Sequence, residues 1–163
     1  MACRGVHFAI TAAQADALAA AVGDAAVMAL VEDIEEAWDA EHLAESDKAW
    51  DAMHRCLTDG DLAYGNGSFP LSHCVLGPRQ LHEGDDYIVS LVTPDEVKEV
   101  AAALASITAD WFRDRYLNLL PKDYAPEYGP DDMEYTWQDL QEVREFYQKA
   151  AASGRAVVFT VDQ

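Results

Sequence analysis

Residues 47–81 read DKAWDAMHRCLTDGDLAYGNGSFPLSHCVLGPRQL and contain two compact blocks separated by a loop. The first block, DKAWDAMHRCLTDG, predicts a helix over residues 47–58, with Ser46 as its cap and Asp59-Gly60 as its stop. The apolar positions of this helix recur every three or four residues, at Trp50, Met53 and Leu57. This spacing indicates one buried helix face, against which the rest of the chain packs.

The second block, PLSHCVLGPRQL, follows the clearest loop in the chain. That loop, residues 60–72, carries three glycines together with Asn66 and Pro70. Pro70 and Pro78 bracket the next residues, which predicts a short turn or a single helical turn anchored by apolar side chains. The two blocks are therefore interpreted as a helix with its stop and a tight connector.

Outside this stretch, three extended segments are predicted near residues 4–10, 87–93 and 155–161. They are rich in β-branched and aromatic residues, which favour strands. Helical patterns fill the intervals between them, and Thr11 and Thr93 have the spacing of helix caps. The expected fold is α+β, with residues 1–163 forming a single compact domain whose small sheet is covered by several helices.

The composition is that of a folded domain. Half of the 163 residues are hydrophobic, which supplies enough apolar material for one core. No apolar run approaches the length of a membrane helix, and the first residues do not have the pattern of a signal peptide. The expectation is a soluble cytoplasmic protein with no membrane association.

The charge is strongly negative, with 30 acidic residues against 11 basic ones and a net charge of −19. Nucleic-acid binding is not expected, because contact with phosphates requires clustered lysine and arginine. The excess of carboxylates is compatible with a basic protein partner, and it is equally compatible with a surface that only keeps the protein soluble. The pattern leaves the oligomeric state open.

A short repeat, AWDAEH at 37–42 and AWDAMH at 49–54, gives two sets of acid, acid and histidine at helical spacing. Such spacing can bring metal ligands to one side of a helix. The alternative is simple packing, because each histidine follows its tryptophan onto the apolar face. No metal is assigned on this basis. The two sets are Glu35, Asp39 and His42, and Asp47, Asp51 and His54.

A thiol nucleophile is a further possibility, built from Cys74 with a nearby histidine. His73 is adjacent in sequence, so its side chain is expected to diverge from the thiol, and the partner would be His54 or His7. The alternative is that the chain's three cysteines are reduced, buried thiols: Cys3, Cys56 and Cys74. Arg79 is expected to pair with a carboxylate, or else to bind an anionic ligand.

The two blocks resemble the signature of the YfbM-like family of small bacterial proteins, DUF1877, a domain of unknown function. The resemblance rests on D-K-x-W-D-x-x-H with its L-T-x-G stop, and on P-L-S-x-x-V-L-G. It implies a compact α+β domain of about this length and no assigned catalytic residue. A family cleft, if present, is expected near a set chosen by its proximity to these motifs: Lys48, Trp50, His54, Ser72 and His73.

The leading functional hypothesis is a non-enzymatic binding or interaction protein with an acidic surface and a basic protein partner. The alternative is a small-ligand-binding or hydrolytic enzyme with a cleft near Trp50, His54 and His73. The nucleotide-binding and common hydrolase motifs GxGxxG, GxxxxGK[ST], GxSxG and HExxH do not occur, and no cofactor is predicted.

Overall fold

The computed structural model describes residues 3–122, 124 and 129–163. Its strands are β1 Gly5–Ile10, β2 Leu43–Asp47, β3 Tyr87–Val92 and β4 Ala156–Asp162. Its helices are α1 Ala12–Ala20, α2 Asp24–Ala37, α3 Trp50–Leu57, α4 Pro94–Ala105, α5 Ala109–Leu119 and α6 Asp132–Ala152. Short 3₁₀ turns are η1 Ala40–His42, η2 Leu71–His73 and η3 Gly129–Asp131.

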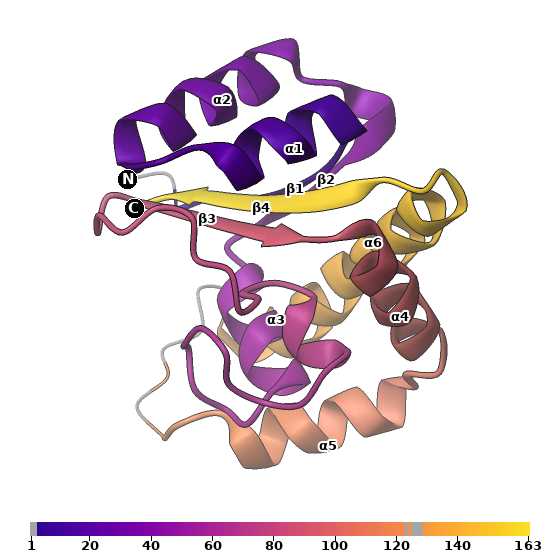
Figure 1. Cartoon of the computed structure of the whole chain (residues 1–163). Helices are drawn as coiled ribbons and strands as arrows, with labels where there is room; N and C mark the ends of the chain where they lie inside the picture. Colours follow the sequence, from indigo (N-terminus) through magenta and orange to yellow (C-terminus); the bar gives the residue numbers. More distant parts are fainter. Residues whose placement is uncertain (1–2, 123, 125–128) are drawn as a thin grey trace.

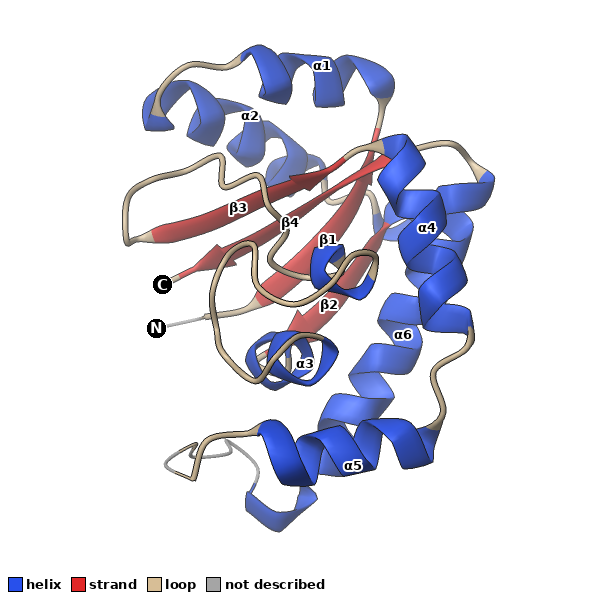
Figure 2. Cartoon of the chain, turned by 60° about the horizontal axis from the view of Figure 1, so that its bottom comes forward, coloured by secondary structure: helices blue, strands red, loops and turns tan. Residues whose placement is uncertain are grey.

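The strands form an antiparallel sheet in the order β2-β1-β4-β3 (Figure 2). The first and last strands of the chain therefore lie side by side at its centre, with His7 opposite Phe159. β1 and β4 are almost entirely buried because helices cover both of their faces. The α+β fold is confirmed, and the three strands predicted from the sequence are all present.

The strand β2 was not predicted, and its presence corrects the expected start of the following helix. Ser46 is not a helix cap: it lies in β2, and its hydroxyl donates to the carbonyl oxygen of Gly5 at 3.3 Å. The chain then turns at Asp47, whose φ is +38°, and α3 begins only at Trp50. The segment before α3 pairs with β1, with Ala44 opposite His7, and the small side chains of Ala44 and Ser46 are buried. The register shifts at Ser46, which has no direct partner on β1.

The helices form layers on the two faces of the sheet (Figure 1). One face packs against α1 and α2, where Val6, Phe8 and Ile10 share a cluster with apolar side chains of both helices. The other face packs against α3, α4 and α6, and α5 lies on the outer side of these helices (Figure 1). Side chains alternate along β1, so that Ala9 belongs to this second cluster while Val6, Phe8 and Ile10 belong to the first.

Local signals account for several helix boundaries. Thr11 with Gln14, and Thr93 with Glu96, form complete capping boxes, and Pro94 occupies the first turn of α4. No helix in the described ranges is both long enough and apolar enough to cross a membrane.

Candidate functional site

The predicted residues Lys48 and Trp50 line one cavity of about 310 Å³. The turn at Asp47 directs the chain so that Trp50 starts α3 with its indole buried, and Nε1 donates to the carbonyl oxygen of Cys3 at 3.0 Å. The remaining lining residues come from both ends of the chain and from neighbouring loops: Cys3, Asp51, Leu62, Tyr124 and Gln163. Three members of the first sequence block therefore share this cavity.

The charged groups of the cavity are of both signs. Asp51 accepts a hydrogen bond from Nε of Arg55 at 2.6 Å, one helical turn away. Burial, together with the nearby charge of Asp132, raises the pKa of Tyr124 well above its usual value, so its phenol stays protonated. The cavity therefore offers a lysine, a carboxylate and a neutral phenol around an aromatic wall.

His54 lies outside this cavity and is fully engaged. Its Nδ1 accepts the backbone N–H of Leu76 at 3.3 Å, so Nε2 carries the proton and contacts the carbonyl oxygen of Ala63 at 2.9 Å and Oδ1 of Asn66 at 2.8 Å. Burial lowers the pKa of His54, which keeps the ring neutral. The imidazole therefore joins α3, the glycine-rich loop and the connector.

Ser72 and His73 belong to a different cluster, next to α4. Nδ1 of His73 lies 3.1 Å from Oγ of Ser72, and Nε2 lies 3.0 Å from Oε2 of Glu96. Glu96 also caps α4 and accepts from Arg79 at 2.5 Å, which gives Arg79 the carboxylate partner expected from the sequence. Ser72 is buried and Glu96 is shared among several donors. These hydrogen bonds and ion pairs therefore hold the connector against α4.

The hypothesis of a thiol nucleophile is not supported by the geometry around Cys74. Nε2 of His7 contacts the carbonyl oxygen of Cys74 at 2.7 Å, and the hydroxyl of Tyr147 donates to the same oxygen at 2.9 Å. The thiol is completely buried, and burial raises its pKa far above neutrality. Cys56 is likewise buried, with a pKa of about 12 for the same reason, whereas Cys3 is half-buried.

The acid–acid–His sets do not form metal sites in the described residues. Glu35 accepts hydrogen bonds from Tyr87 and Thr160, and Asp39 contacts His42 at 2.8 Å. The second set is split by the turn between β2 and α3, and its histidine is engaged as described above. Within the described ranges, no group of three or more His, Cys, Asp or Glu side chains is arranged to hold a metal ion.

A groove of about 520 Å³ lies between the edge strand β2 and the helix α6. Its floor includes Ala44 and Phe146, which are buried. Its rim carries exposed glutamates from both sides, and Lys149 reaches across to donate to the carbonyl oxygen of Glu41. The lining acidic residues are Glu41, Glu45, Glu142 and Glu145. The groove therefore contains four carboxylates and one ammonium group.

Asp139, on α6, interacts electrostatically with Glu142 of the groove, and its pKa is shifted. It is half-buried on α6, and burial together with the charges of Glu142 and Asp47 raises its pKa to about 6. A hydrogen bond with Tyr135 opposes this shift. The pKa of Asp139 is therefore raised chiefly because its carboxyl group is partly buried, and the nearby carboxylates of Glu142 and Asp47 add to that effect.

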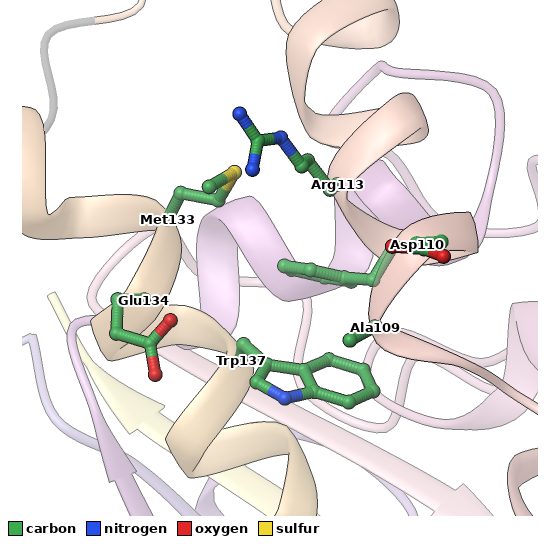
Figure 3. Close-up of a pocket in the computed structure, with 7 residues that line it drawn as sticks. Ala109, Asp110, Arg113, Met133, Glu134 and Trp137 are labelled. Atoms are coloured by element: carbon green, nitrogen blue, oxygen red, sulfur yellow. The ribbon is translucent and has the colours of Figure 1, made fainter.

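A smaller pocket of about 140 Å³ lies between α5 and α6 (Figure 3). Phe112 and Trp137 form its aromatic wall, with ring centroids 5.4 Å apart. Arg113 and Glu134 approach it from the two helices (Figure 3). Its size suits a single side chain, and it carries charges of both signs.

Sequence reasoning missed the glutamates of the β2–α6 groove because it missed β2. Glu45 and Glu142 are almost a hundred positions apart, and only the pairing of β2 with β1 places them on one groove. A weak signal exists in LAESD, where Ala44 and Ser46 alternate with residues that are more exposed. Small residues at alternate positions do not distinguish a strand from a loop.

Comparison with known proteins identifies the family. The family model for a domain of unknown function, DUF1877, matches residues 1–160, and the chain belongs to this family. The crystal structure of YfbM from Escherichia coli, a protein of unknown function, is similar with a TM-score of 0.62 at 20% identity. That match covers 97% of this chain and 99% of the other, so it establishes a shared fold. No curated protein shows a significant match.

Proposed function

We propose that this chain is a non-enzymatic binding protein that recognises a basic protein partner through the β2–α6 groove. The observation that carries the proposal is the groove of about 520 Å³ with four glutamates on its lining. Its volume lies within the range of ligand clefts, and its buried floor gives a partner apolar surface to cover.

Charge complementarity supports a basic rather than an acidic or neutral partner. The rim glutamates are exposed and therefore available for contact with lysine or arginine side chains. The net charge of −19 attracts a basic partner from a distance and raises its association rate at low salt.

The test is a titration with an acetylated and amidated hexapeptide of alternating lysine and threonine, followed by calorimetry at low and at physiological salt. We expect measurable binding that weakens as salt is raised. The double variant Glu142→Lys/Glu145→Lys should weaken binding by about tenfold or more.

The matched control is Glu32→Lys/Glu36→Lys, which changes the net charge equally on exposed positions of α2, across the sheet. This control should change the affinity by less than about threefold. Equal weakening by the two double variants, or no binding of the hexapeptide at about 1 mM, contradicts the proposed groove.

A second candidate function is favoured by the cavity of about 310 Å³ that contains Lys48, Trp50 and Asp51. Such a cavity is large enough for a small polar molecule, and its mixed charges suit a zwitterion such as an amino acid. Crystals soaked in a mixture of amino acids test this function directly. Density beside Trp50 that is lost in Lys48→Met supports it, and an empty cavity at high amino-acid concentration counts against it.

A further inference from the structure

The two edges of the sheet are protected differently. Along β3, residues 79–81 cover the outer edge: the N–H of Leu81 donates to Val89 O at 2.9 Å and the N–H of Leu91 to Arg79 O at 3.4 Å. A bridge between Gln80 and Ser90 lies between these two bonds. The edge at β3 is therefore already capped by the protein's own chain.

The outer edge of β2 has no such cap in the described part of the chain. β2 pairs with β1 on one side only, and no other strand of the described residues pairs with it. At its C-terminal end, the N–H of Ala49 donates to the carbonyl oxygen of Ser46 at 2.8 Å. In an antiparallel strand, alternate residues direct their N–H and C=O groups away from the partner. Over residues 43–45 the strand therefore leaves its outward-facing N–H and C=O groups free, before the irregularity of the ladder at Ser46.

This open edge is also a wall of the β2–α6 groove, to which Leu43, Ala44 and Glu45 all contribute. The glutamates discourage pairing with a second acidic copy of this chain, because like charges would face one another across the new ladder. They favour pairing with a basic segment for the opposite reason. The open edge of β2, the groove beside it and the negative charge of its glutamates thus all favour a basic, extended segment.

We infer that the basic partner binds as an extended segment that hydrogen-bonds to β2 and extends the sheet by one strand. The inference rests on the proposed function and specifies how the partner binds. A strand placed about 4.8 Å from β2 runs along the groove, and its side chains alternate between the two faces of the sheet. The side chains on one of these faces point towards Glu142 and Glu145 on α6. We therefore expect lysine or arginine at every second position of the bound segment.

Backbone methylation of the hexapeptide tests this mode. One peptide carries N-methyl groups on its lysines and the other carries them on its threonines, so each blocks the N–H groups of a different edge. We expect one methylated peptide to bind about tenfold or more weakly than the parent, and the other to stay within about threefold. Amide exchange of residues 43–47 should also slow on addition of the parent peptide.

The outcomes separate this inference from the proposed function. Equal effects of the two methylation patterns, or unchanged exchange at residues 43–47, overturn strand addition. The proposed groove still stands in that case if Glu142→Lys/Glu145→Lys weakens the parent peptide and the α2 control does not. Failure of the parent peptide to bind overturns both.

Discussion

Replacement of Asp139 by asparagine should stabilise the protein at neutral pH. The carboxyl group has a pKa of about 6 in the folded chain, against 3.8 as its ordinary value, because burial and the charges of Glu142 and Asp47 disfavour ionisation. Folding therefore opposes ionisation of this group above pH 4. Asparagine removes that cost and keeps a side-chain oxygen that accepts the hydrogen bond from Tyr135.

The magnitude follows from the size of the shift. A difference of about two pKa units corresponds to roughly 3 kcal/mol at 1.36 kcal/mol per unit. Because the group is half-exposed, solvent screening reduces this by about half, to ~1.5 kcal/mol. For a chain of this length, that gain raises Tm by about 3–6 °C.

The sign of the pH dependence is defined by which state binds more protons. Between pH 3.8 and about 6 the folded state holds the Asp139 proton more tightly than the unfolded state, so stability falls as pH rises through this window. Above pH 6 the cost is complete. The gain from Asp139→Asn should thus be full at pH 7.5 and roughly half as large at pH 5.

Urea denaturation at the two pH values measures the gain, and carboxyl carbon NMR measures the pKa directly. Asp16→Asn is the control, because it removes one exposed carboxylate from α1. A similar gain for this control would attribute the effect to net charge. A titration midpoint for Asp139 below about 4.5 would refute the reasoning.

Three further predictions concern buried groups. His54→Ala removes the acceptor of the buried N–H of Leu76 and should lower the free energy of unfolding, measured in urea, by about 2–4 kcal/mol. The metal content, measured by elemental analysis, should not change. A loss below about 0.5 kcal/mol would contradict the structural role of His54. Iodoacetamide at pH 7.5 should label Cys3 in the folded protein, and Cys56 and Cys74 only after unfolding, because the latter two thiols are buried. Mass spectrometry that finds Cys74 labelled first would support the hypothesis of a thiol nucleophile. Gly60→Ala should cost about 1–3 kcal/mol in thermal unfolding, because φ is +97° and the new Cβ would lie 2.5 Å from a backbone oxygen; an unchanged Tm would show that this turn relaxes freely.

Much of the fold is predictable because local chemistry determines it. Strands rich in valine and aromatic residues, and threonine caps followed by glutamine or glutamate, carry their own signals along the chain. The strand β2 carries only a weak signal, since Ala44 and Ser46 are small residues whose burial depends on the sheet and on packing against distant parts of the chain. Tertiary contacts therefore override a weak local preference at this point.

The candidate sites were predictable to a lesser degree. Lys48 and Trp50, which the prediction grouped by their proximity in the first motif, line the same cavity because a turn and a short helix keep neighbours together. His54 and His73 face different partners, since one helical turn or one 3₁₀ turn is enough to redirect a side chain. The β2–α6 groove is formed by residues far apart in sequence, so no local sequence pattern predicts it.

The strand order β2-β1-β4-β3 also affects how the chain acquires its structure during synthesis. β4, which separates β1 from β3, leaves the ribosome after the other three described strands. Until Ala156–Asp162 emerges, no ladder joins the antiparallel pair of β1 and β2 to β3. Nascent chains arrested before residue 156 should therefore remain protease-sensitive, and the completed chain should fold more slowly than a helical bundle of equal size.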